Sequence, residues 1–164
     1  MSATLLHDLS LVFARDLNAL RAEVLAYPDD ASVWAAPSGV PNAGGTLVLH
    51  LCGNMRHFVG AGLGNSGYVR DREAEFSTRG TSRAELAALI HITIAEVTLA
   101  LQSCPAARLG ESMQLGPASI PIHRALLHLA THLAYHLGQL DYHRRIVTGD
   151  GQGVGAMALP PIVG

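Results

Sequence analysis

The chain has 164 residues, enough for one domain whose core needs no disulfide or metal to hold it together. Hydrophobic residues make up 49% of it and charged residues only 15%, but no uninterrupted apolar stretch is long enough to span a membrane. The formal net charge is −2, and all 11 basic residues are arginines scattered along the chain. We therefore expect neither nucleic acid nor a membrane as a partner.

The amino-terminal residues and the cysteines both point to the cytoplasm. Residues 1–9 lack the basic segment, apolar block and small-residue cleavage site of a signal peptide. Cys52 and Cys104 are too few for a disulfide framework and form no CxxC pair. We expect a cytoplasmic protein with reduced thiols.

Four segments show apolar residues at steps of three and four, which is the period of a helix with one apolar face. The predicted helices cover Ser2 to about Tyr27, Thr46 to Leu63, Arg83 to about Cys104, and Pro121 to about Thr148. Ser82 and Glu85 form a capping-box signature before the third helix, and Gly149 ends the fourth.

The fourth predicted helix is the longest and the clearest. Its expected apolar side consists of Leu126, Leu127, Ala130, Leu133, Ala134, Leu137 and Leu140. Residues 68–80 are charged and without period, and 106–120 read as another loop. We predict an all-α four-helix bundle over residues 1–149, followed by an irregular Gly/Pro-rich tail over 150–164. A looser orthogonal bundle is the alternative.

Histidine is the unusual feature of the composition, with nine in the chain. His128, His132 and His136 recur every four residues, so they share one face of the fourth helix. Imidazoles at i and i+4 are close enough to bind one ion. His50, in the middle of the second helix, is the best source of a third ligand, because a buried imidazole there needs a partner.

Other polar residues fall near this arrangement. Asn54 and His57 follow His50 on the same stripe of the second helix and are expected to line the same cavity. For His7, His91 and His123 we expect a surface or hydrogen-bonded core position. His128 and His143 remain open between a supporting role and the surface. Cys52 points away from the stripe, so we expect it in the core.

Several metal chemistries are disfavoured by absent motifs. The HExxH of metalloproteases would need Glu at Leu133, and none of the six glutamates has a histidine three residues later, as di-iron bundles require. No CxxCH, GxSxG or GxGxxG occurs either. The pattern therefore favours a single ion bound by histidines.

The segments around these histidines resemble the DinB-like superfamily. The resemblance lies in Thr46-Leu-Val-Leu-His50-Leu and in His132-x-x-x-His136-x-Gly138-Gln139-x-x-x-x-Arg144. Gly53-Asn54 and the segment Arg70-Asp71-Arg72-Glu73-Ala74-Glu75-Phe76 are similar to those of an uncharacterised subgroup. The likeness covers about residues 46–145.

This resemblance implies an up-down-down-up bundle with a long crossover, frequent homodimers, and nickel or zinc on His50, His132 and His136. Asn54, His57, His128 and Gln139 are then candidates for the pocket or for supporting the ligands. Some superfamily members are metal-dependent thiol transferases that use mycothiol, bacillithiol or glutathione. Composition favours a solvated loop for the charged residues of 68–76, whereas the resemblance favours a segment that shapes the pocket or a dimer contact.

Three classes of function remain open for this protein. The leading hypothesis is a metal-dependent transferase of a low-molecular-weight thiol to a small-molecule electrophile. A metal-dependent hydrolase is the second enzymatic hypothesis, although no free carboxylate is evident near the histidines. A metal-binding stress-response protein or a purely structural bundle would be non-catalytic.

Overall fold

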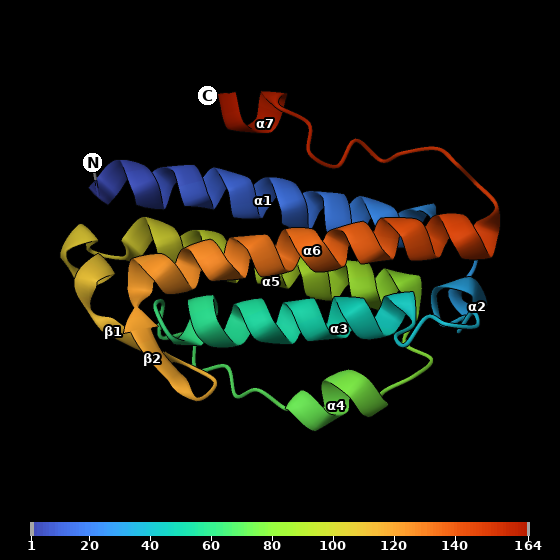
Figure 1. The fold of residues 1–164 in the computed structure, drawn as a ribbon, viewed down its shortest axis with the longest axis horizontal. Coiled ribbons are helices and arrows are strands. Elements are labelled where there is room, and N and C mark those ends of the chain that lie inside the picture. Colours follow the sequence, from blue (N-terminus) through green and yellow to red (C-terminus); the bar gives the residue numbers. More distant parts are fainter. Residues whose placement is uncertain (1, 164) are drawn as a thin grey trace.

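Four long helices run side by side along the longest axis of the molecule (Figure 1). They belong to a computed structural model that describes residues 2–163. The helices are α1 (Ser2–Ala26), α3 (Gly44–Met55), α5 (Arg83–Ser103) and α6 (Ile122–Thr148). Both α1 and α3 pack against α5 and α6. The all-α class is confirmed in this broad sense.

Shorter elements join and cover the long helices. They are α2 (Asp30–Val33), the π-helix η1 (Arg56–Ala61), α4 (Arg72–Ser77), the 3₁₀ helix η2 (Ala106–Gly110), the strands β1 (Ser112–Leu115) and β2 (Ala118–Pro121), and α7 (Pro160–Val163). The two strands form an antiparallel hairpin with Met113 opposite Ile120. The prediction of a simple loop over 106–120 was therefore wrong, because this segment contains a short helix and most of a hairpin.

The predicted ends of the long helices are set by local hydrogen bonds. The Ser82 hydroxyl accepts from the Glu85 backbone N–H over 3.2 Å, and the Glu85 carboxylate accepts from the Ser82 N–H over 2.9 Å. This reciprocal pair is the predicted capping box of α5. Gly149 ends α6 with a φ of 69°, a left-handed conformation that suits glycine.

The core is formed by the apolar stripes of the helices. On α1 the fully buried residues include Phe13, Leu17 and Leu20, as the periodicity predicted. On α6 the buried leucines are Leu126, Leu129, Leu133, Leu137 and Leu140. Leu127 is 49% exposed, so its assignment to the apolar side was wrong. A residue directly after a buried one is rotated about 100° around the helix and faces outward here.

The predicted second helix is not α-helical throughout. It begins at Gly44 and changes after Met55 to the π-helix η1, in which the Gly62 N–H donates to the His57 carbonyl over 3.0 Å. Glycine lowers the preference for regular helix in this region. At its end, a Cβ on Gly64 would lie 2.7 Å from the Ala100 Cβ, so glycine allows the chain to approach α5 closely.

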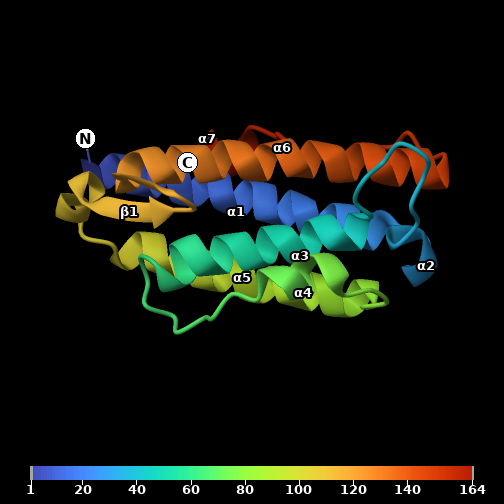
Figure 2. The same cartoon turned by 60° about the horizontal axis from the view of Figure 1, so that its bottom comes forward.

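The helix α4 lies against α3 (Figure 2). It occupies part of the charged segment 68–80 that showed no period in the sequence. Asp71 caps it by accepting from the Ala74 backbone N–H over 2.9 Å. A helix of six residues is too short to produce a recognisable apolar repeat. The contacts of Glu75 with His50 and Gly53 place α4 beside the middle of α3.

The residues after α6 return along the outside of α1 (Figure 1). They are irregular up to α7 and are attached by Arg144 and Arg145, which donate to the carbonyls of Gln152 and Gly151 over 2.6 Å each. The division into a domain over 1–149 and a tail over 150–164 stays a prediction.

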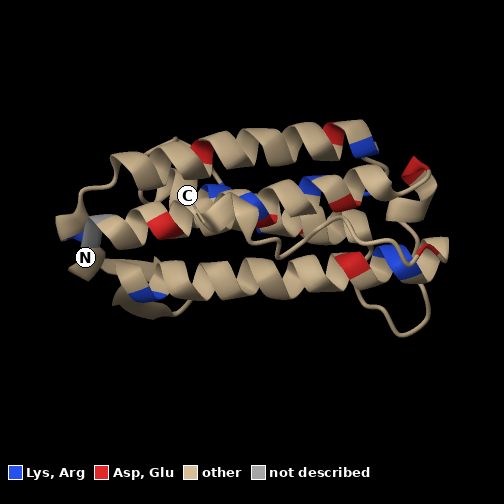
Figure 3. Ribbon diagram, turned by 90° about the horizontal axis from the view of Figure 1, so that it is seen from above, with Lys and Arg blue, Asp and Glu red and all other residues tan. Residues whose placement is uncertain are grey.

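One described helix, α5, is long and apolar enough to cross a membrane by length and composition alone. It packs against α1 and α3 and contributes Leu86, Ile90 and Val97 to the core. The share of its apolar window that is buried inside the molecule is 39%. Arginines and acidic residues are interspersed on the ribbon (Figure 3).

Candidate metal centre

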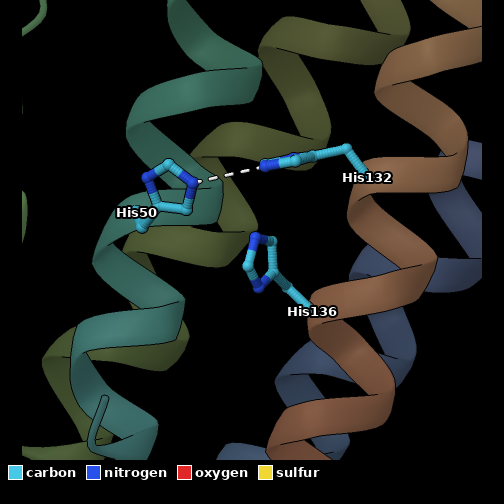
Figure 4. A group of neighbouring side chains, drawn as sticks. All are labelled: His50, His132 and His136. Carbon is cyan, nitrogen blue, oxygen red and sulfur yellow. Dashed lines mark hydrogen bonds between the residues drawn. The ribbon is translucent and has the colours of Figure 1, made fainter. Parts of the chain in front are cut away.

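Three histidine side chains from two helices point toward one another (Figure 4). His50 comes from α3, and His132 and His136 come from successive turns of α6. Each offers one ring nitrogen, and the three nitrogens lie within 4.8 Å of one another. The three residues singled out in the sequence are therefore brought together, and the cluster they form has the composition of a metal site.

The distance between two of the ring nitrogens in this cluster suits a small divalent ion. The Nε2 atoms of His50 and His132 are 3.4 Å apart. Two nitrogens that each lie about 2.1 Å from a tetrahedral zinc ion are separated by about 3.4 Å. The chemistry of the donors also fits, since imidazole nitrogens are suitable ligands for zinc, copper, iron and nickel.

Two of the cluster histidines, His132 and His50, favour the uncharged form that metal binding requires. Burial, together with the neighbouring His136 and His50, lowers the pKa of His132 to about 4. Burial also lowers the pKa of His50, against the opposing effect of the Glu75 carboxylate. At neutral pH both rings therefore keep a lone pair for an ion.

Glu75 is the nearest carboxylate to the cluster and supports His50 from the outer side. Its Oε2 lies 3.0 Å from His50 Nδ1. Arg70 donates to both carboxylate oxygens, over 2.6 Å from Nε and 2.8 Å from Nη2. Phe76 packs on the same imidazole, with ring centroids 5.1 Å apart. Residues 70–76 thus form the outer wall of the cluster.

The other two histidines are supported differently. Gln139 Oε1 lies 2.6 Å from His136 Nδ1 and holds that ring from one turn further along α6. His132 Nδ1 is buried and has no hydrogen-bond partner among the described residues. His132 is therefore the least supported of the three rings among the described residues.

The remaining predicted site residues have separate positions. Asn54 is 8% exposed, and its Oδ1 has no partner among the described side chains. His128 is exposed, with its ring 6.1 Å from that of His132. His57 lies in η1 and lines another cavity, of about 440 Å³, beside the hairpin residue Met113. Of the four supporting candidates, Gln139 is the one with a hydrogen bond to a cluster histidine.

Glu75 was not identified as part of the site from the sequence. Composition favoured a solvated loop for residues 68–76, yet Glu75 is only 5% exposed. Its separation from His50 by 25 residues leaves no helical spacing that would connect the two. The available signal was the resemblance of the segment from Arg70 to Phe76 to a subgroup motif.

The two thiols take no part in the cluster. Cys52 is fully buried, as expected, and burial raises its pKa to about 12. Cys104 is also buried and free. Neither is positioned as a reactive thiolate.

A small cavity lies one helical turn from the cluster on both helices. Its volume is about 190 Å³, and Leu47 of α3 and Gln139 of α6 line it together with Tyr142, His143, Ile146 and residues 39–42. Leu47 precedes His50 by three residues, and Gln139 follows His136 by three. The cavity lining contains no arginine or carboxylate.

Comparison with known proteins places the chain in a family. Residues 9–155 match the family described as "Protein of unknown function (DUF1572)". The match spans most of the chain, including the three cluster histidines and Glu75, and the chain belongs to this family. Neither the curated proteins nor the solved structures contain a match.

Proposed function

We propose that this protein is a divalent-metal-binding member of the DinB-like superfamily, with nickel or zinc on His50, His132 and His136. The observation that carries the proposal is the convergence of three ring nitrogens, from two helices, within 4.8 Å. The sequence resemblance to the superfamily and the side-by-side packing of the four long helices support it.

We further propose that the bound ion activates a low-molecular-weight thiol of the mycothiol, bacillithiol or glutathione kind for transfer to a small electrophile. A divalent ion supplies Lewis acidity and lowers the pKa of a thiol or water that it contacts. Three neutral imidazoles leave the charge of the ion uncompensated, which favours an anionic thiolate as a further ligand. Three protein ligands and an open position are typical of catalytic sites.

The chain supplies binding and orientation for such a reaction. His132 and His136 are fixed on the rigid α6, and Gln139 orients His136. The neighbouring cavity beside Leu47 and Tyr142 is the proposed place for the uncharged part of the electrophile. Its volume of about 190 Å³ suits a small molecule or one end of a larger one.

Hydrolysis receives less support than thiol transfer. A hydrolase would need a base beside the ion. Glu75 is the nearest carboxylate found, but both of its oxygens accept hydrogen bonds from Arg70, and one also contacts His50. It is therefore engaged in structure rather than free to take a proton from water.

The test is a metal analysis of the protein as purified, followed by a screen of thiols against epoxides, alkyl halides and isomerisable acids. We expect about one divalent ion per chain and thiol-dependent loss of an electrophile, both removed in His132→Ala. His91→Ala is the matched control, because His91 is an exposed histidine on α5.

Each outcome separates the alternatives. Metal without any thiol-dependent turnover would leave the non-catalytic stress-response protein, and turnover of esters or amides without thiol would favour the hydrolase. A protein purified without metal and unaltered by chelator or by added Zn²⁺ and Ni²⁺ would overturn the metal proposal as a whole.

A cytoplasmic homodimer completes the proposal. The outward side of α5 carries Ala88, Ile92, Ala95 and Leu99, of which Ile92 is 48% and Leu99 67% exposed. An exposed apolar stripe of this kind is typical of a protein contact. Light scattering at several concentrations measures the mass, and a strict monomer would contradict the dimer.

A further inference from the structure

Glu75 contacts His50 because the segment around Glu75 packs on the part of α3 that carries His50 and Gly53. Glu75 belongs to α4 and His50 to α3, and these helices pack against each other. At their contact the partner of Glu75 on α3 is Gly53, one turn from His50. A Cβ on Gly53 would lie 2.7 Å from Glu75 Cδ and 3.2 Å from its Cγ. Only glycine leaves room for the buried carboxylate at this place.

The hydrogen-bonding pattern gives the carboxylate one role toward His50. A carboxylate paired with arginine accepts hydrogen bonds, so the Nδ1–H of His50 donates to Glu75 Oε2 over 3.0 Å. Arg70 Nη2 donates to the same oxygen over 2.8 Å. The separation of 3.4 Å between Arg70 Nη2 and His50 Nδ1 is then the distance between two donors that share one acceptor.

The tautomer of His50 follows from this bond. With the proton on Nδ1, the lone pair lies on Nε2, the atom that faces His132 Nε2 at 3.4 Å. We propose that Glu75, fixed by Arg70 and admitted by Gly53, is a positioning residue that directs the Nε2 lone pair of His50 into the histidine cluster. That this positioning serves metal binding rests on the proposed function. The orientation of His50 itself rests on the hydrogen bonds alone.

The three cluster histidines would then be supported unequally. His50 has an ionised acceptor, His136 has the neutral amide oxygen of Gln139, and His132 has no partner for Nδ1. Hydrogen bonds to charged groups are about twice as strong as neutral ones. His50 is therefore the most rigidly oriented ligand, and disturbing its support should weaken metal binding most among the supporting residues.

The experiment uses Glu75→Gln and Gly53→Ala in the full chain. The first removes the charge, and the second displaces an unaltered Glu75. Glu73→Gln is the matched control, since Glu73 is an exposed glutamate of the same helix. Long-range proton–nitrogen NMR on the metal-free protein reports which His50 nitrogen is protonated, and competition with a chromophoric chelator gives the Kd for Zn²⁺.

We expect Nδ1–H on His50 in the unaltered chain and in Glu73→Gln, and a mixture of tautomers in the other two variants. The Kd for Zn²⁺ should rise about 10- to 100-fold in Glu75→Gln and Gly53→Ala. In Glu73→Gln it should change less than about twofold, as for a remote surface charge.

The results distinguish this inference from the proposed function. An unaltered chain that binds no Zn²⁺, but whose His50 tautomer depends on Glu75, would remove the metal function and keep the positioning role. If Glu75→Gln binds Zn²⁺ tightly and keeps the same His50 tautomer, the metal function stands and the positioning role is removed. An Nε2–H tautomer in the unaltered chain overturns the inference even where a variant fails to fold.

Discussion

Arg144 of α6 donates from Nε to Glu23 Oε2 of α1 over 2.5 Å, with both side chains almost wholly buried. A second nitrogen of the same guanidinium donates to the carbonyl of Gln152 over 2.6 Å. Burial raises the pKa of Glu23, while Arg144 acts in the opposite direction. This pair joins α1, α6 and the residues after α6 at a single point.

Removing one member of the pair should be costly. Arg144→Leu leaves Glu23 buried without its partner, and we expect the free energy of unfolding to fall by about 3–5 kcal/mol. Urea unfolding at pH 7 measures it. Arg145→Leu, which breaks a more exposed pair with Asp141, should cost much less.

A double variant separates the pair from simple loss of packing. In Glu23→Leu combined with Arg144→Leu neither buried charge of the pair remains, so the cost of the double change should be well below the sum of the two single changes. Additive costs would show that the two residues do not act as a pair.

Metal binding should be visible as added stability. A ligand at 100 times its Kd stabilises the folded state by about 2.7 kcal/mol. In a chain of this size that corresponds to a rise in Tm of roughly 5–10 °C. We expect this rise with Zn²⁺ and its reversal by chelator in calorimetry. If the rise in Tm with Zn²⁺ persists in His50→Ala, the assignment of His50 as the third ligand is contradicted.

The long helices could be predicted because each carries an apolar period and a recognisable end. The capping box of Ser82 and Glu85 and the glycine stop at Gly149 fixed two of these ends closely. The hairpin and α4 were missed because they are too short for periodicity. The π-helix depends on a change in hydrogen bonding after Met55 that no residue pattern announces.

The site was predictable where its residues follow one helix. His132 and His136 share a face by spacing, and His50 was found as a buried histidine in a second apolar run. Glu75 was not found from the sequence, because its contact with His50 depends on how α4 packs on α3 and on the space left by Gly53. Such contacts between segments are decided by packing rather than by local sequence.

The metal-free protein should lose stability in mild acid because of His132. Its pKa in the folded state is about 4, below the ordinary value of 6.5, so between these values the unfolded chain binds more protons. Stability is therefore retained above pH 6.5 and falls as the pH approaches 4, by up to about 3 kcal/mol. Burial lowers the pKa of His143 as well, which acts in the same direction.

Urea unfolding in the presence of chelator at pH 7, 6, 5 and 4 measures this dependence. Carboxylates also contribute to acid denaturation, so the informative quantity is the difference between the unaltered chain and His132→Gln. We expect the variant to show the shallower decline between pH 6.5 and 4. Equal declines would show that His132 is not buried in its neutral form.

Gly138 lies in the middle of α6, two residues after His136, on an exposed part of the helix. A Cβ there would meet no atom within 4 Å. Glycine inside a helix is about 1 kcal/mol less favourable than alanine, partly because it gives the unfolded chain more freedom. Gly138→Ala should therefore raise the free energy of unfolding of the metal-free protein by roughly 0.5–1 kcal/mol, measured in urea.

Gly53→Ala serves as the opposite case, since its Cβ would collide with Glu75 and should lower stability. A destabilised Gly138→Ala would mean that this face of α6 is covered in solution, for example by a second copy of the chain.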